Sequence, residues 1–238
     1  MTNAETAAPT STATSTAPPR YGPIGTAADQ CIRALQRGYR DDRPYAVAAL
    51  ARLRRGAGRQ ANDLTELWGQ TGTEQLAAEL AVLPDDERRR VDFDRADQAL
   101  HLVTTLWALH QQSHRDANMH VASSGLGRAV RELMRAVSPG GGAAGESSAQ
   151  DLDEPIRRRF VRVGNAGSLD MLGARLREVV QLLRNRRIPL DYALLAEQLY
   201  RWQNPAQRAD VRRAWGRDFH LAAMRRKPEA GDKGAGSS

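Results

Sequence analysis

The chain has 238 residues, a mass of 26.2 kDa and a formal net charge of +7, with an isoelectric point near 10.2. Hydrophobic residues make up 41% of it, which is enough for a folded core and argues against wholesale disorder. No apolar run approaches the roughly 18 residues of a membrane span, and the first 20 residues do not resemble a signal peptide. The single cysteine, Cys31, cannot form an internal disulfide, so we expect a cytoplasmic protein with no membrane association.

The basic residues are unevenly distributed. Of the 35 basic residues 33 are arginine, a ratio that a GC-rich genome can also produce, and only Lys227 and Lys233 are lysine. Residues 1–137 carry 17 arginines and 16 acidic residues, a net charge of +1, whereas residues 156–226 carry 16 arginines and six acidic residues, a net charge of +10. A positive C-terminal part would attract polyanions or acidic proteins.

Two ordered parts are predicted, at residues 27–137 and 152–226, between segments rich in small residues, Pro and Gly. We expect residues 1–26 and 227–238 to be disordered tails, and residues 138–151 to be a flexible linker. Both ordered parts show helical periodicity, and neither shows an alternating strand pattern. The predicted fold class is therefore all-α, with an N-terminal helical domain and a basic C-terminal helical domain, each a small bundle.

In the first part, the apolar pattern predicts a central helix of about six turns after Pro84. Its inward stripe, spaced by three and four residues, contains Phe93, Ala96, Leu100, Val103, Trp107, His110 and His114. The segment 124–137 places an apolar face opposite three arginines, Arg128, Arg131 and Arg135. We expect these three to form a solvent-facing row.

In the second part, three further helical stretches follow one another. Pro155 suits a first helical turn, a second helix covers 169–183, and another follows Pro189. Asn204 and Pro205 are a cap and first-turn pair that opens the last helix. Five aromatic residues fall on predicted core stripes, which leaves few to stack on bases: Phe93, Trp107, Phe160, Trp215 and Phe219.

Two groups of side chains could suggest metal chemistry. His110 and His114 are four residues apart and His120 follows, but the glutamate of an HExxH zinc site is missing, so we expect structural histidines bonded to backbone or neighbouring helices. The carboxylates of 85–87 and of Asp92, Asp94 and Asp97 could serve a metal-dependent nuclease, although 85–87 lie just after Pro84, where negative charge suits a helix start. No nucleophile motif or phosphate-binding loop is present. We predict no catalytic residues, no metal ion, no cofactor and no enzyme activity.

The arginines remain the candidate functional residues. Beside the row at 128–135, the run RRRFVRV places Arg157, Arg158, Arg159 and Arg162 around a helix whose inward residues are Ile156, Phe160 and Val163. Rows of this kind suit contacts to phosphates, which give affinity without reading sequence. We expect any bound nucleic acid to be held mainly by its backbone.

Several motifs together resemble the CasB family, the small subunit of the type I-E CRISPR surveillance complex Cascade. They are LHQQSHRDANMHVASSGLGRAVREL, RRRFVRV, LREVVQLLRNRRIPLDYALLAEQLYRW and VRRAWGRDF, and the resemblance covers roughly residues 27–221. It implies a non-catalytic helical protein of which two copies associate head to tail. The implied partners are the large subunit, the backbone subunits that carry the CRISPR RNA, and the R-loop of target DNA, especially its displaced non-target strand.

The resemblance also implies particular binding residues. Arg128, Arg157, Arg158 and Arg177 occupy positions that are commonly basic in the family, and helical geometry adds Arg131, Arg135, Arg162 and Arg184. The segments 1–26 and 138–151 have no counterpart in the family pattern. The alternative is a helical DNA-binding transcriptional regulator, with a helix-turn-helix at 190–222, but the long amphipathic last helix is unlike a short recognition helix.

Overall fold

The computed structural model describes residues 20–58, 67, 69–137 and 146–224 of the chain. Within these ranges it has ten helices and no strand, and one isolated β-bridge joins His120 to Leu190. The predicted all-α class is therefore confirmed. None of these helices is both long and apolar enough to cross a membrane.

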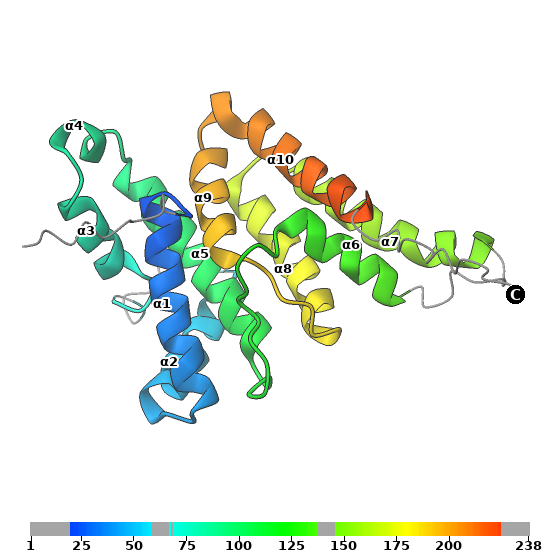
Figure 1. The fold of residues 1–238 in the computed structure, drawn as a ribbon, viewed down its shortest axis with the longest axis horizontal. Helices are drawn as coiled ribbons and strands as arrows, with labels where there is room; N and C mark the ends of the chain where they lie inside the picture. Colours follow the sequence, from blue (N-terminus) through cyan, green and yellow to red (C-terminus); the bar gives the residue numbers. More distant parts are fainter. Residues whose placement is uncertain (1–19, 59–66, 68, 138–145, 225–238) are drawn as a thin grey trace, which may run out of the picture.

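The helices follow one another along the chain, and the connection from α5 to α6 is the long segment 112–125 (Figure 1). They are α1 (Pro23–Arg40), α2 (Pro44–Gly56), α3 (Thr73–Ala81), α4 (Asp85–Arg88), α5 (Phe93–Gln111), α6 (Leu126–Val137), α7 (Glu146–Gly164), α8 (Leu169–Asn185), α9 (Tyr192–Trp202) and α10 (Pro205–Met224). Side-chain caps begin several of them: Ser168 accepts from the Met171 amide before α8, and Asp191 from the Leu194 amide before α9. The predicted cap of the last helix is confirmed, since Asn204 Oδ1 accepts from the Ala206 amide at 3.1 Å.

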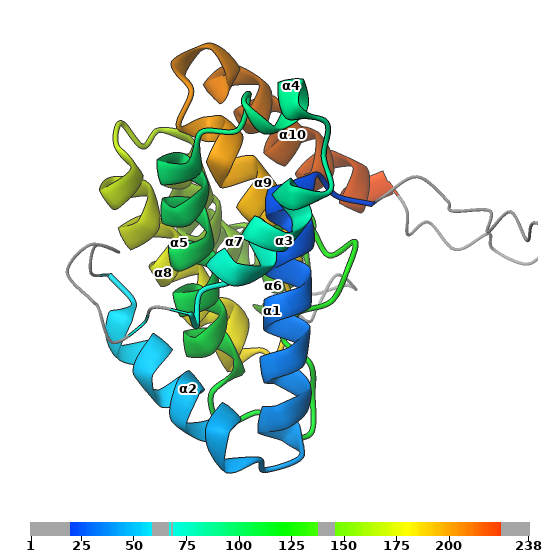
Figure 2. The same cartoon turned by 90° about the vertical axis from the view of Figure 1, so that its left-hand side faces the viewer.

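Helix α5 occupies the centre of the molecule, where α1, α2, α8 and α9 pack around it (Figures 1 and 2). Its predicted stripe is buried from Ala96 to His110. The prediction was wrong at both ends of the stripe. Phe93 is 47% exposed because it is the first residue of the helix, beyond the neighbours that cover the rest, and His114 follows the helix end at Gln111.

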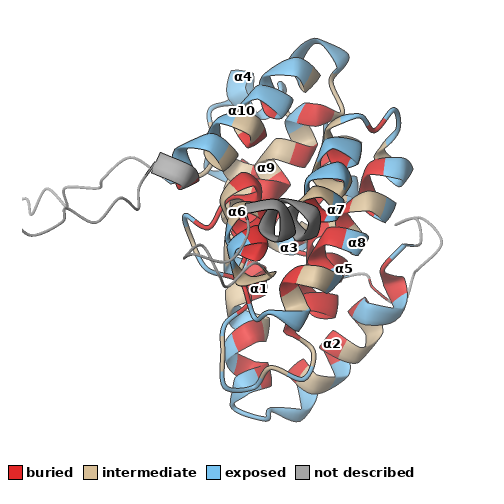
Figure 3. Cartoon of the chain, turned by 90° about the vertical axis from the view of Figure 1, so that its right-hand side faces the viewer, coloured by how far each residue is buried: buried red, intermediate tan, exposed pale blue. Residues whose placement is uncertain are grey.

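The two predicted parts share one hydrophobic core. It runs from Ile24 on α1 through Trp107 on α5 to Leu176 on α8 and Trp215 on α10. In Figure 3 the buried residues line the inward faces of the helices, and the exposed residues lie on the outer faces. The basic C-terminal helices are therefore positioned by packing against the N-terminal ones, and the domain boundary stays a prediction.

Two predicted segment boundaries are corrected. Helix α1 begins at Pro23 and Ile24 is buried, so the end of the predicted tail at 1–26 is ordered. Helix α7 begins at Glu146, which makes 146–151 helical rather than part of the linker and places Pro155 inside the helix. The run from Glu146 to Glu154 contains no Gly or Pro, so nothing in it ends a helix. The rest of the predicted tails and linker lies outside the described residues.

Candidate nucleic-acid interface

The eight predicted binding arginines lie on three different helices. Arg128, Arg131 and Arg135 are on α6, the next three are on α7, and the last two are on α8. The structure does not bring them together into one row, and each group has its own kind of neighbours.

Two of the three α6 arginines contact another helix. Arg128 is half-buried, and its backbone amide donates to Asp218 on α10. The Arg131 guanidinium lies 5.4 Å from the centre of the Phe219 ring, and its Nε is buried without a hydrogen-bond partner among the described residues. Arg135 donates to the carbonyl oxygen of Ala222, also on α10. Arg135 is nevertheless exposed, whereas Arg128 and Arg131 are half-buried. The expectation of a row that faces solvent along its whole length is therefore wrong at Arg131, which packs against α10.

The α7 arginines remain accessible. The side chains of Arg157, Arg158 and Arg162 are 61%, 74% and 59% exposed. Arg157 and Arg158 each donate through Nε to the Glu154 carboxylate at 2.9 Å, and these two hydrogen bonds lower the pKa of Glu154. Arg162 lies 3.9 Å from Glu178, at the limit of an ion pair. Two cations thus share one carboxylate, and this stretch of α7 keeps a net positive charge.

The α8 arginines join the two parts of the chain. Arg177 Nη1 donates to the Ala57 carbonyl at the end of α2, at 2.6 Å, across 120 residues of sequence. Arg184 Nε donates to the Gln112 carbonyl at the end of α5, at 3.4 Å. Both residues are half-buried, and contacts from them to nucleic acid stay a prediction.

Further arginines that the sequence did not single out as binding residues are held by backbone carbonyls. Arg208 donates to the Gly167 carbonyl at 3.4 Å and lies 4.1 Å over the Trp202 ring, and Arg212 donates to the Ala166 carbonyl at 3.2 Å. A neutral carbonyl orders a guanidinium without cancelling its charge, whereas a carboxylate cancels it. These residues therefore add ordered positive charge near the α7–α8 turn. The +10 charge of the segment was the only sequence signal for them.

The first two histidines have structural bonds, as predicted. His110 is fully buried, and its Nδ1 lies 2.9 Å from the Tyr192 hydroxyl. Burial lowers the pKa of His110 to about 3, so the ring is neutral. His114 Nε2 lies 3.1 Å from the backbone carbonyl oxygen of Arg184. These rings connect α5 and the following loop to α8 and α9.

The third histidine, His120, bridges α1 and α9. Its Nδ1 accepts from the Tyr192 amide at 3.2 Å, so the proton is on Nε2, which donates to Asp29 Oδ1 at 2.9 Å. Burial raises the pKa of Asp29, but hydrogen bonds from His120 and Arg33 outweigh it and hold that pKa below its usual value. His120 therefore also has a structural role, which the helical stripe of His110 and His114 did not predict.

The carboxylates considered for metal binding do not converge. Within the described part of the chain, no group of three or more His, Cys, Asp or Glu side chains could hold a metal ion. Three of these carboxylates bond to an arginine three or four residues away: Asp85 to Arg88, Asp86 to Arg90 and Asp92 to Arg95. Asp97 accepts from the Thr73 hydroxyl of α3. Asp85 and Asp86 begin α4, as their position after Pro84 predicted, and Asp92 caps α5.

Cys31 is a core residue. It is buried on α1, its Sγ donates to the Gln70 carbonyl at 3.6 Å, and burial raises its pKa to about 12. A thiol that stays protonated is a poor nucleophile.

The fold and its charges define a class: an all-α protein with ordered arginines on one group of helices. The comparisons specify it further. Residues 49–220 match the family model of the CRISPR-associated protein Cse2. The chain is similar to the crystal structure of CasB from Thermobifida fusca, with 44% identity and a TM-score of 0.67 over 84% of this chain and 99% of that one. The chain therefore belongs to the CRISPR-associated Cse2 family.

More distant structures share the fold. A Cse2-family protein from Thermus thermophilus is 20% identical with a TM-score of 0.50, over 82% of this chain and 97% of that one. A chain of a CRISPR RNA-guided surveillance complex is 22% identical with a TM-score of 0.55, over 84% and 95%. Among curated protein sequences there is no match.

Proposed function

We propose that this chain is the non-catalytic small subunit of a type I-E Cascade complex and that it stabilises the R-loop by holding target DNA, especially the displaced non-target strand. The observation that carries the proposal is the α7 surface, defined by Arg157, Arg158 and Arg162. All three side chains are exposed, and the nearby carboxylates leave this surface with a net positive charge. Family membership supplies the context.

Weak contacts are sufficient for this role. The heteroduplex in an R-loop is about as stable as the DNA duplex that it replaces, so a few phosphate contacts to the displaced strand shift the balance. Each neutralised phosphate of a single strand contributes about 0.7 to the slope of log K against log salt. Three exposed arginines on one helix can bind a passing strand weakly when alone and effectively when the complex holds them beside it.

The partners in this proposal are a second copy of the chain in head-to-tail arrangement, the crRNA-bound backbone subunits, and the large subunit, in the cytoplasm. The support is the 44% identity to CasB and the shared fold with a chain of a surveillance complex. The regulator alternative is not favoured, because α10 uses Val211 and Trp215 to pack into the core. Cleavage then belongs to another protein, and this chain needs no cofactor.

The test is a reconstituted complex that contains the double variant Arg157→Gln and Arg158→Gln. We expect unchanged assembly and several-fold faster dissociation of bound target DNA, measured by fluorescence after addition of unlabelled competitor. The matched control removes two charges elsewhere, with Arg55→Gln and Arg89→Gln, both exposed and without an ion pair among the described residues. If both double variants lose DNA at the wild-type rate, the α7 surface does not hold the strand.

A photoactivatable non-target strand provides the positional test. Cross-links to peptides that contain 157–162 support the proposal. Cross-links confined to the other subunits contradict it.

A further inference from the structure

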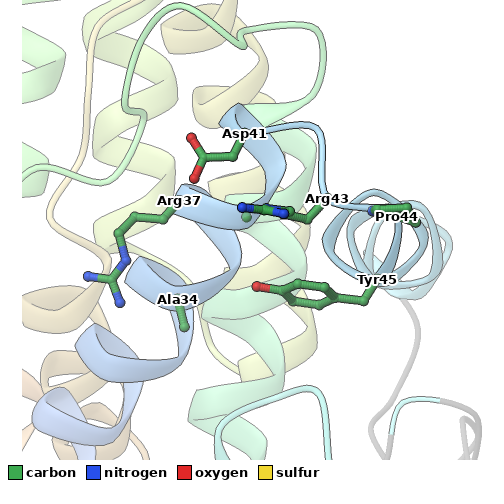
Figure 4. A pocket seen from close by; sticks show the side chains of 7 residues that line it. Ala34, Arg37, Asp41, Arg43, Pro44 and Tyr45 are labelled. Carbon is green, nitrogen blue, oxygen red and sulfur yellow. The ribbon is translucent and has the colours of Figure 1, made fainter.

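A hollow lies between the end of α1 and the start of α2 (Figure 4). These two helix ends lie away from α7 in Figure 1. It has a volume of about 580 Å³, within the range of small-ligand pockets. The chain reverses at Asp41–Arg43, where the Arg43 amide donates to the Gly38 carbonyl at 2.8 Å and Asp42 takes a left-handed φ of 56°. The turn fixes the spacing of the residues that line the hollow.

One wall of the hollow is the ring of Tyr45. This side chain is 62% exposed, although its hydroxyl reaches α1. A Cβ at Gly38 would lie 2.6 Å from the Tyr45 hydroxyl oxygen, so only a glycine there lets the ring come so near. Figure 4 shows the side chains of Tyr45 and Arg43 extending in the same direction, toward α1. The result is a supported aromatic ring with a face open to a ligand.

The two arginines that line the hollow make no side-chain hydrogen bond or ion pair within the described residues. They are Arg37 and Arg43, and both are exposed. Their neighbour Arg40, in contrast, bonds to Asn118 Oδ1 and to the Arg115 carbonyl. Asp41 is the one acidic residue that lines the hollow. The pocket therefore combines two unpaired guanidiniums, one carboxylate and one open aromatic face.

We propose that this pocket binds one nucleotide of a single-stranded nucleic acid. The base stacks on Tyr45, the phosphate lies between Arg37 and Arg43, and Asp41 accepts a hydrogen bond from the exocyclic amino group of cytosine, adenine or guanine. Thymine offers one N–H between two carbonyl oxygens that repel the carboxylate, so it binds more weakly. An acidic peptide fits less well, because Asp41 repels it and its carboxylates do not need the aromatic face.

The pocket is independent of the α7 surface. It is built by residues 34–45, which precede the 49–220 segment matched by the family model. Helices α2 and α7 also lie toward opposite ends of the long axis in Figure 1. A result that contradicts nucleotide binding at the pocket therefore does not contradict DNA binding at the α7 surface, and the reverse is also true.

The test uses the purified full-length chain and fluorescein-labelled 12-mers of dC and dT, with binding measured by anisotropy. We expect dC to bind more tightly than dT. Tyr45→Ala should weaken dC binding roughly tenfold, whereas Tyr45→Phe, which keeps the ring, should preserve it. Asp41→Asn should reduce the preference for dC over dT. The double variant Arg37→Gln and Arg43→Gln should lower the salt slope by about 0.7, because the two guanidiniums share one phosphate.

The controls separate this site from general charge and from α7. The double variant Arg55→Gln and Arg89→Gln removes the same charge elsewhere, and the α7 double variant should change the salt slope without changing the preference for dC. If Tyr45→Ala leaves both affinity and base preference unchanged, the proposal is wrong. It is also wrong if poly-glutamate binds at the pocket and displaces no oligonucleotide.

Discussion

Helices α6 and α7 show the same pattern in sequence but have different surroundings. Each carries arginines three or four residues apart opposite an apolar face, and in each case this pattern predicts a cationic surface that faces solvent. On α6, Arg131 is half-buried against Phe219 of α10, and Arg135, although exposed, donates to the Ala222 carbonyl of α10. On α7, Arg157 and Arg158 are exposed and bond to Glu154 of their own helix. The periodicity of a helix indicates which face is polar, but it does not indicate whether another helix covers that face.

Glycine at two positions explains why α10 reaches α6. A Cβ at Gly127 would lie 2.3 Å from the Trp215 carbonyl oxygen and 2.4 Å from the Phe219 amide nitrogen. A Cβ at Gly125 would lie 2.4 Å from an Asp218 carboxylate oxygen, and that carboxylate accepts from the Arg128 amide at 2.9 Å. The outward positions of α7 carry arginines and Val161, and Arg157, Arg158, Val161 and Arg162 are exposed.

The largest expected effect comes from filling the contact between α6 and α10. Gly127→Ala places a methyl group against α10 backbone that cannot rotate away, so the two helices must separate. We expect a loss of about 3 kcal/mol in the free energy of unfolding, measured by urea denaturation followed by circular dichroism. An unchanged midpoint would mean that α6 and α10 are not in close contact.

The matched control is Gly216→Ala on α10. Nothing lies within 4 Å of a Cβ built there, so the change only improves helix propensity. We expect it to stabilise the protein by about 0.5 to 1 kcal/mol.

The next prediction compares how much an arginine of α6 and an arginine of α7 contribute to the free energy of unfolding. Arg131→Ala removes the contact with Phe219 and the aliphatic stem, and should cost about 1 to 2 kcal/mol. Arg131→Met keeps the stem and should recover part of the loss. Arg158→Ala, with its side chain 74% exposed, should change the free energy of unfolding by no more than about 0.5 kcal/mol. Equal losses at the two positions would remove the distinction between them.

The sequence was sufficient to predict features set by local chemistry. The all-α class, the buried centre of α5 and the start of the last helix at Pro205 all follow from periodicity and capping residues. These interactions join residues a few positions apart, so their geometry is fixed once the helix forms.

The sequence was insufficient where distant segments meet. Arg177 bonds to Ala57 across 120 residues, and Arg131 meets Phe219 only because Gly127 admits α10. The exposure of Phe93 depends on where the neighbours of α5 end. None of these contacts can be recognised from neighbouring residues in the sequence. The sequence therefore indicated the candidate arginines, but not that those of α6, α7 and α8 have different neighbours.

The third prediction concerns binding of single-stranded DNA by the isolated protein. Replacing Arg157 and Arg158 by glutamine should lower the slope of log K against log salt by about 1.4 and weaken binding roughly tenfold near 0.15 M salt. Arg131→Gln should leave the slope unchanged, because α10 restricts access to that side chain. The measurement is a salt titration by fluorescence anisotropy. A lower slope in the Arg131 variant would show that DNA reaches the α6 row.

The smallest expected effect comes from the one carboxylate that both exposed α7 arginines share. Glu154 competes with phosphate for Arg157 and Arg158, and their hydrogen bonds lower its pKa below its usual value, so it is ionised throughout pH 6 to 8. Glu154→Gln removes the competing charge and should strengthen DNA binding by about threefold, in the direction opposite to the arginine variants. Because Glu154 does not titrate between pH 6 and 8, this gain should be the same across that range. A gain that shrinks toward pH 6 would indicate that another group, rather than this carboxylate, limits the charge of α7.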